Sequence, residues 1–210
     1  MPTTASARPL YAGADPIHDF DHVLRVYHMA ERLAAAEGAD VEIVRAAALL
    51  HDAQKAAPDG DRSQHHRASA ELAREILTAE GWSSDRIEAV LHCIRAHRFR
   101  DTTEPPATIE AKCLFDADKL DVLGAIGVAR TVGYAAIAGE PAYAEPSARF
   151  MATGEKEPGE PHSSYHEYLF KLSKVKDRLH TATARAIAAE RHRAMAEFYE
   201  RLRAEMRGEL

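Results

Sequence analysis

The sequence lacks the features that mark several large classes of protein. No apolar run reaches the eighteen or more residues that a membrane span requires, and residues 1–14 lack the basic start and apolar core of a secretory signal. Two cysteines, Cys93 and Cys113, are too few for a disulfide framework and too far apart for a CxxC metal site. We therefore expect a cytoplasmic protein with reduced thiols that does not cross a bilayer.

Charge and motif content argue against further functions. The net charge is −6 and there is no long basic tract, whereas binding to duplex nucleic acid needs clustered Lys and Arg. The chain has no P-loop, no Gly-rich dinucleotide fingerprint and no GxSxG elbow, so a nucleotide-driven motor and a serine hydrolase both lack support. Histidine is the compositional excess, with twelve residues.

Helical periodicity dominates the chain. Apolar residues recur at three- and four-residue steps, and Gly, Pro or capping residues bound the periodic segments. The pattern predicts helices over 16–37, from Asp40 to the His51-Asp52 doublet, and over 65–80, 83–97 and 108–123, with further helices in the last fifty residues. Almost no segment alternates, so the sequence predicts an all-α protein.

The doublet His51-Asp52 directly follows the apolar run 46–50, and this placement invites a metal-site interpretation. Histidine and carboxylate ligands suit Mn, Fe, Ni, Zn or Mg. Adjacent helical residues point about 100° apart, so both reach one ion only if it lies beside the helix, and other helices must supply the remaining ligands. His22 is one candidate, and the acidic cluster of the "FDADKLD" segment offers others: Asp116, Asp118 and Asp121.

A structural interpretation of the doublet is also open. His51 would then satisfy a hydrogen bond in the core, and Asp52 would cap the helix or pair with Lys55. A dipeptide arises often by chance, and alone it favours this interpretation. The ordered set of an upstream helical histidine, the doublet and a downstream acidic cluster favours the metal site.

This ordered set resembles the H...HD...D signature of the HD-domain superfamily of metal-dependent phosphohydrolases. Four further segments are similar to its bacterial stand-alone YedJ/YpgQ-like subgroup: "HRASAELAREIL" (66–77), "IRAHRFR" (94–100), "DADKLDVLGAIGVARTVGY" (116–134) and "EYLFKLSKVKDRLHTATARAIAAERHRAM" (167–195). Members of the subgroup are all-helical, and the best understood are divalent-metal nucleotide pyrophosphohydrolases. The resemblance implies a single HD-domain helical bundle with extra C-terminal helices.

We accordingly expect one domain over residues 1–210. Its predicted parts are a loose N-terminal arm (1–15), a core that holds the metal site (16–135), a loop or lid (139–161) and C-terminal helices (162–210). The loop is rich in Pro, Gly and Glu, and its composition suits an inert connector somewhat better than a gate.

The resemblance implies a ligand set for one divalent ion, which would be Mn, Ni, Co, Fe, Zn or Mg. His22, His51 and Asp52 match the first three ligands. Asp118 is the preferred fourth, because it follows a small residue and precedes a basic residue and leucine. Asp121, one turn later, would orient a ligand histidine or pair with Lys119 or Arg130.

His65 and His97 match positions that bind a second ion in di-metal members of the superfamily. In a one-metal site they would face the substrate phosphate, and for His65 simple solvent exposure is an equal alternative. His97 stands in "AHRFR" with Arg98 and Arg100 beside it, and arginine is a natural bidentate ligand of phosphate.

The implied mechanism uses water activated by the ion against phosphorus. Asp52 or a neighbouring carboxylate would assist removal of the proton, with His97 and Asp121 as further catalytic candidates. The residues expected to contact substrate phosphates are Lys55, His65, Arg98, Lys119 and Lys171. Lys55 has a simpler alternative as a lysine that the helix dipole favours, and Tyr168 stands where the subgroup usually has a second lysine, which bears on substrate identity.

The function expected is phosphohydrolysis of a small nucleotide or phosphate ester, with release of pyrophosphate from a nucleoside triphosphate preferred. The alternatives are a nucleotidase or phosphodiesterase of the same fold, a di-iron oxygenase, and a non-catalytic metal-binding module. Residues 53–57 lack the Glu-Asp pair of the alarmone hydrolases, and "HRFRDTTEPP" lacks the Gly-Tyr-Pro element of the cyclic-dinucleotide branch. The sequence leaves the oligomeric state open, a dimer included.

Overall fold

The computed structural model describes residues 1–12, 19–54, 64–98 and 103–210, and every regular element in these residues is helical. The chain divides into two compact units. The first unit comprises Met1–Lys119 with Leu179–Ala184, and the second comprises Leu120–Arg178 with Arg185–Leu210. Each unit is described by itself.

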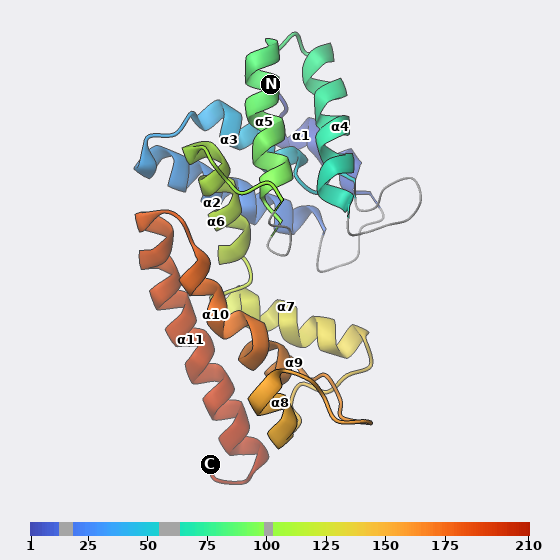
Figure 1. Cartoon of the computed structure of the whole chain (residues 1–210), viewed down its shortest axis with the longest axis vertical. Coiled ribbons are helices and arrows are strands. Elements are labelled where there is room, and N and C mark those ends of the chain that lie inside the picture. The colour runs from blue at the N-terminus through green and yellow to red at the C-terminus, as the bar shows by residue number, and fades with distance from the viewer. Residues whose placement is uncertain (13–18, 55–63, 99–102) are drawn as a thin grey trace. The chain divides into compact units, whose positions relative to one another are not determined.

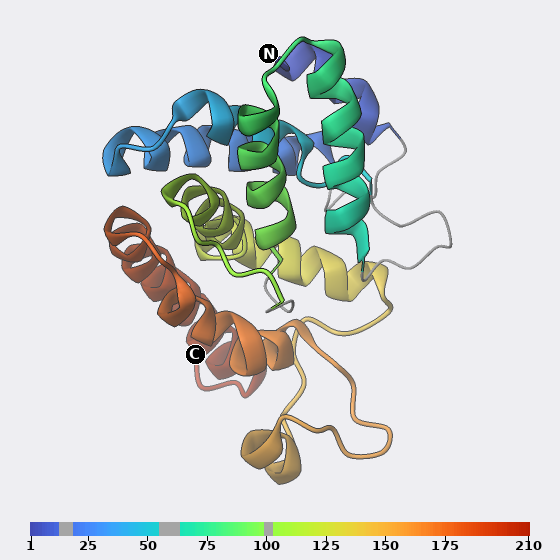
Figure 2. The same ribbon diagram turned by 45° about the horizontal axis from the view of Figure 1, so that its top comes forward.

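The first unit contains the two short N-terminal helices, the next four helices in full, and all but the last residue of a fifth. In chain order they are α1 (Thr4–Ala7), the 3-10 helix η1 (Arg8–Tyr11), α2 (Phe20–Glu37), α3 (Val41–Leu50), α4 (His65–Ala79), α5 (Ser84–Ala96) and α6 (Ile109–Leu120). Helix α3 lies at the centre of this unit, because it contacts α1, α2, α4 and α5. Figures 1 and 2 show α4 and α5 side by side.

Capping residues mark the start of α2 and α3 and the end of α2. The carboxylate of Asp19 accepts hydrogen bonds at the start of α2, and that of Asp40 does the same for α3. Gly38 ends α2 with φ of 73°, in the left-handed conformation expected of it. Seven of the ten residues of α3 are buried, which is the pattern of a helix surrounded on all sides. Helix α3 therefore ends, with its doublet, inside the unit.

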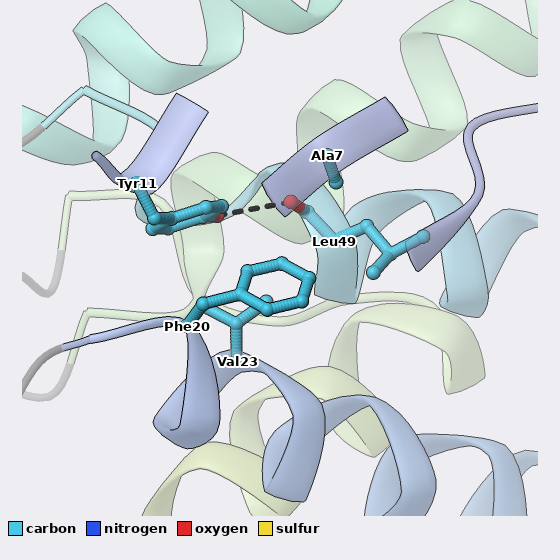
Figure 3. Packing of buried hydrophobic residues seen from close by; sticks show 5 residues of the cluster. All are labelled: Ala7, Tyr11, Phe20, Val23 and Leu49. Atoms are coloured by element: carbon cyan, nitrogen blue, oxygen red, sulfur yellow. Dashed lines mark hydrogen bonds between the residues drawn. The ribbon is translucent and has the colours of Figure 1, made fainter. Parts of the chain in front are cut away.

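The N-terminal arm is more ordered than we expected. Thr3 and Ser6 form a capping box at α1, and Ala7 and Tyr11 are buried against Phe20 and Leu49. Figure 3 shows these side chains around the hydroxyl of Tyr11, which donates to the carbonyl oxygen of Leu49 at 2.9 Å. The prediction of a loose arm was wrong for residues 1–12, because an apolar stripe in two short turns suffices to dock them; residues 13–15 lie outside the described part.

The helix predicted over 108–123 ends three residues early, at Leu120. A new helix, α7, begins at Gly124, whose φ of 71° lies in the left-handed region that a side chain rarely adopts. No single helix in the described ranges is long and apolar enough to span a membrane, although α6 and α7, taken as a broken pair, have the required length and composition.

The second unit is built from α7 and the C-terminal helices. Its elements are α7 (Gly124–Ile137), α8 (Ala148–Thr153), α9 (Ser164–Glu167), the π-helical turn η3 (Tyr168–Leu172), α10 (Ser173–Val175), the 3-10 turn η4 (Lys176–Arg178) and most of α11 (Ala182–Met206). Helix α11 is the long C-terminal helix of Figure 1. The core of the second unit includes Tyr168 and Tyr199, whose rings stack with 4.5 Å between their centroids.

The segment predicted as a loop, 139–161, contains helix α8 and is held by a partly buried hydrogen-bond network. Glu160 accepts from the backbone N–H and the hydroxyl of Ser147, both at 2.7 Å, and from the N–H of Glu157 at 2.6 Å. It also contacts Nε2 of the fully buried His166 at 3.0 Å. One carboxylate thus ties Ser147, the N-cap residue of α8, to His166 of α9. A role of this segment as a gate stays a prediction.

Candidate metal centre

Three helices of the first unit bring the predicted metal ligands together. His22 lies in the first turn of α2, where its N–H donates to the capping carboxylate of Asp19 at 3.2 Å. His51 is the C-terminal cap of α3, and Asp52 lies in the turn that follows. The doublet therefore stands at the end of α3, where the chain turns, instead of within its last helical turns.

The ligand atoms of His22, His51 and Asp52 all lie within 4.8 Å of one another. A second group with the same property consists of Asp52, His65 and His97. Asp52 belongs to both: its Oδ2 is 3.6 Å from His51 Nε2, and its Oδ1 is 3.4 Å from His65 Nε2 and 3.5 Å from His97 Nε2. Two candidate metal sites thus share one carboxylate.

Backbone carbonyls orient two of the histidines. His51 Nδ1 lies 2.8 Å from the oxygen of Ala48, and His97 Nδ1 lies 2.6 Å from the oxygen of Ile94. Because a carbonyl only accepts, Nδ1 is the protonated nitrogen in each ring, and Nε2 presents its lone pair to Asp52 and its neighbours. Histidines that bind metals typically donate their other ring N–H to such an acceptor, which fixes the orientation of the ring.

The electrostatics of the site favour the protonation states in which His51 and Asp52 can bind a metal ion. Burial lowers the pKa of His51 to about 4, and the charge of Asp52 only partly offsets this effect, so the imidazole is neutral near pH 7. Burial raises the pKa of Asp52, but His51, His97 and His22 outweigh it and hold that pKa well below its usual range. A neutral imidazole and an ionised carboxylate are the forms that bind a cation.

Two buried atoms of the doublet have ion-pair contacts with neighbouring site residues but no hydrogen bond. His51 Nε2 and Asp52 Oδ1 make no hydrogen bond to any described residue, although buried polar atoms are nearly always paired. Both atoms belong to the ligand groups defined above. A divalent cation would satisfy them with donors of suitable type, so the residues present fit the ion that the sequence resemblance implies.

Asp118, the predicted fourth ligand, lies beside this group. Its Oδ1 is 3.5 Å from His22 Nε2, and its carboxylate pairs with Lys119. Burial raises the pKa of Asp118, but the charges of Lys119 and His22 more than reverse the effect, so the group is ionised. Its carboxylate is thus available at the edge of the first group, and its assignment as a ligand stays a prediction.

The remaining predicted site residues fall in different places. Arg98 follows His97 in the first unit and is partly buried. Asp121 and Lys171 belong to the second unit, where Asp121 pairs with Arg130 and Lys171 pairs with Glu167 at 2.8 Å. The catalytic role expected of Asp121 and the phosphate contacts expected of Lys119 and Lys171 stay predictions. Lys55 and Arg100 lie outside the described residues.

Asp116 has a role that its sequence pattern did not reveal. Its buried carboxylate accepts from the N–H of His180 at 2.9 Å and from the N–H and hydroxyl of Thr181, both at 2.7 Å. Within the first unit it therefore holds the segment that begins α11. Three aspartates stand within six residues, and nothing in their spacing distinguishes this structural group from a ligand.

Known proteins share both the sequence pattern and the fold of this chain. The HD domain family profile matches residues 19–123. The chain is 33% identical to the uncharacterized protein YpgQ of Bacillus subtilis over 194 residues, which are 91% of this chain and 85% of YpgQ. The crystal structure of B. subtilis YpgQ in complex with ADP has a TM-score of 0.74 at 29% identity and 97% coverage of both chains.

A further solved structure is similar to the same extent. The crystal structure of an HD-superfamily hydrolase from Bacillus thuringiensis has a TM-score of 0.73 at 28% identity, covering 97% of this chain and 94% of the other. The likeness thus extends over nearly the full length of the chain, beyond the span that the family profile matches.

Proposed function

This chain belongs to the HD-domain family, in its YpgQ-like subgroup, and is a metal-dependent phosphohydrolase; we propose that it acts on small nucleotides and releases pyrophosphate from nucleoside triphosphates. The observation that supports the proposal most directly is the grouping of His22, His51 and Asp52, whose ligand atoms lie within 4.8 Å of one another. The ADP complex of YpgQ supports the nucleotide class of substrate.

His22, His51 and Asp52 would hold the ion, with Asp118 as the fourth ligand. A divalent cation at such a site lowers the pKa of water and neutralises charge that develops on the phosphoryl group. The chain supplies the geometry in advance, because the carbonyl oxygen of Ala48 keeps the ring of His51 in one orientation. Preorganisation of this kind avoids reorganisation during the reaction.

Between Asp52 and His97, the two catalytic candidates that lie in the first unit, the geometry supports His97 for proton transfer. A carboxylate whose pKa is held far below its usual range is a weak base. The ring of His97 presents Nε2 as an acceptor, since its Nδ1 donates to Ile94. We therefore assign Asp52 to ion binding and His97 to proton transfer, with His65 and Arg98 as the groups that contact the substrate phosphates.

The second ligand group, Asp52, His65 and His97, would hold a second ion if one binds. This group is also the one that a di-iron oxygenase would need. The two functions differ in their requirement for oxygen: a phosphohydrolase releases phosphate or pyrophosphate anaerobically with a redox-inert metal, whereas the oxygenase consumes O₂ and needs iron. Anaerobic assays with Mg²⁺ and Mn²⁺ separate them.

The test is a panel of nucleoside tri-, di- and monophosphates and one phosphodiester, assayed with Mn²⁺, Ni²⁺, Co²⁺ and Mg²⁺. We expect pyrophosphate from triphosphates with at least one metal, Mn²⁺ first. His51→Ala should lower the rate at least about 100-fold, because it removes a ligand and leaves its partners misaligned. His28→Ala is the matched control, since His28 is an exposed histidine of α2.

Two outcomes would contradict the proposal. One is a wild-type protein that hydrolyses no member of the panel with any of the four metals. The other is a His51→Ala variant that retains the wild-type rate. Release of orthophosphate instead of pyrophosphate would favour the nucleotidase alternative, and hydrolysis of the diester alone would favour a phosphodiesterase.

A further inference from the structure

Helix α3 ends without a glycine, and its last carbonyl groups are satisfied by specific donors. The final carbonyls of any helix have no partner within it. In α3 the oxygen of Ala48 faces Nδ1 of His51, that of Leu50 accepts from the N–H of Ala53 at 3.3 Å, and that of Leu49 accepts from the hydroxyl of Tyr11 at 2.9 Å. The only long-range donor among these three is Tyr11.

Tyr11 reaches the end of α3 from the N-terminal arm, ahead of the residues that match the family profile. Its side chain is buried, and its ring packs against Phe20 with 5.6 Å between centroids (Figure 3). A tyrosine hydroxyl keeps its proton at neutral pH, and this one donates it to the carbonyl oxygen of Leu49.

Ser69 of α4 holds the chain on the other side of the doublet. Its hydroxyl accepts from the N–H of Gln54 at 3.0 Å and contacts the carbonyl oxygen of Gln54 at 3.1 Å. Ser69 is fully buried. The doublet His51-Asp52 thus lies between two anchored residues, Leu49 and Gln54, and each anchor is a buried hydroxyl from another helical segment.

We propose that Tyr11 and Ser69 are positioning residues for the metal centre: their hydroxyl groups fix the chain on both sides of His51-Asp52 and thereby align the ligand atoms before an ion binds. The inference rests on the proposed function, because it assumes that the doublet binds metal. Ligands held by a supporting shell bind an ion more tightly than mobile ones, and loss of such a shell typically weakens metal affinity about 10- to 100-fold. Tyr11 and Ser69 bond to the backbone of Leu49 and Gln54 instead of to the ligand side chains, so the expected effect is smaller.

The experiment measures the Mn²⁺ dissociation constant by calorimetry on protein first stripped with a chelator. Tyr11→Phe keeps the ring and removes only the donor, and Ser69→Ala removes the second anchor. We expect each variant to bind Mn²⁺ about 3- to 10-fold more weakly than the wild type. Tyr143→Phe is the matched control, because Tyr143 donates to Glu145 in the second unit, and it should leave the affinity unchanged.

A purely structural role predicts a different result. Ala30→Gly weakens the buried middle of α2 and removes none of the hydrogen bonds described at the end of α3, so it serves as the comparator for general loss of stability. If Tyr11→Phe and Ser69→Ala lower the melting temperature as Ala30→Gly does but bind Mn²⁺ within twofold of the wild type, the inference is overturned. It is also overturned if Ala30→Gly weakens binding equally.

The two levels of the proposal fail separately. A wild-type protein that binds none of Mn²⁺, Ni²⁺, Co²⁺ and Mg²⁺ would contradict the proposed function, and the positioning role would fall with it. The positioning role alone would be contradicted if the wild type binds Mn²⁺ and the folded variants among Tyr11→Phe and Ser69→Ala bind it with the same affinity.

Discussion

Replacement of Asp116 by alanine tests the distinction between a structural and a metal-binding aspartate in one short segment. Asp116 accepts hydrogen bonds from three donors, which are the N–H groups of His180 and Thr181 and the hydroxyl of Thr181. The carboxylate and Thr181 are both buried. Alanine would leave two backbone donors without partners at the start of α11, so we expect a large loss of stability and no specific effect on the ion.

The magnitude follows from the number and kind of bonds. Hydrogen bonds to a charged group contribute about 1.5 to 3 kcal/mol each, and effects at one site are not additive. Allowing for this, Asp116→Ala should lower the free energy of unfolding by about 3 to 5 kcal/mol. In a chain of this size 1 kcal/mol corresponds to about 2 to 4 °C, so the melting temperature should fall by roughly 6 to 20 °C.

The assay is thermal unfolding followed by far-UV circular dichroism, first with a chelator and then with Mn²⁺. Asp118→Ala is the control, because Asp118 lies two residues away and contacts His22. We expect Asp116→Ala to unfold early in the chelator yet to keep its stabilisation by Mn²⁺, which at 100 times the dissociation constant is about 2.7 kcal/mol. Asp118→Ala should lose much of that stabilisation. A wild-type melting temperature for Asp116→Ala, or the reverse assignment of the two effects, would refute the reasoning.

Two further predictions concern the second unit. Burial raises the pKa of Glu160, but the N–H groups of Ser147 and Glu157 and the ring of His166 outweigh it and lower that pKa from 4.5 to about 2. A carboxyl group with a lowered pKa stabilises the folded state at pH values above its unfolded pKa, so the wild-type free energy of unfolding should decline as the pH falls from about 4.5 to 2. Glu160→Gln should show a shallower decline when thermal unfolding is measured across this acid range. Gly154 and Gly139 both have positive φ, but a Cβ at Gly154 would overlap the ring of Phe170, whereas one at Gly139 meets no described atom within 4 Å. In urea unfolding, Gly139→Ala should therefore lower the free energy of unfolding by about 1 to 2 kcal/mol, and Gly154→Ala should lower it by about 1 to 3 kcal/mol more. Equal losses in the two variants would show that the ring of Phe170 adapts.

The all-α fold could be predicted because its signals are local. Apolar periodicity together with Gly38 and Asp40 places the end of α2 and the start of α3, and these features act through neighbouring backbone atoms. The family comparisons confirm the predicted HD fold. His22, His51 and Asp52 could be proposed as metal ligands because they match the recurring H...HD...D signature.

The structural roles of Asp116, Tyr11 and Glu160 could not be predicted, because they depend on contacts with residues that no local sequence pattern identifies. Asp116 is structural only because the segment at Thr181 returns to it, 65 residues later. Tyr11 acts at the end of α3 only because the N-terminal arm docks there, although the spacing of Ala7, Leu10 and Tyr11 at helical steps was a usable signal for burial. Glu160 likewise orders a segment whose Pro and Gly content predicts a loop.

The central claim is that His22, His51 and Asp52 bind one divalent cation. Anomalous diffraction from crystals grown with Mn²⁺ tests it most directly, because the signal locates the ion itself. The account predicts a peak at bonding distance from His51 Nε2, a carboxylate oxygen of Asp52 and the ring of His22. A fully occupied peak elsewhere in the molecule, with these three side chains free of metal, would contradict it.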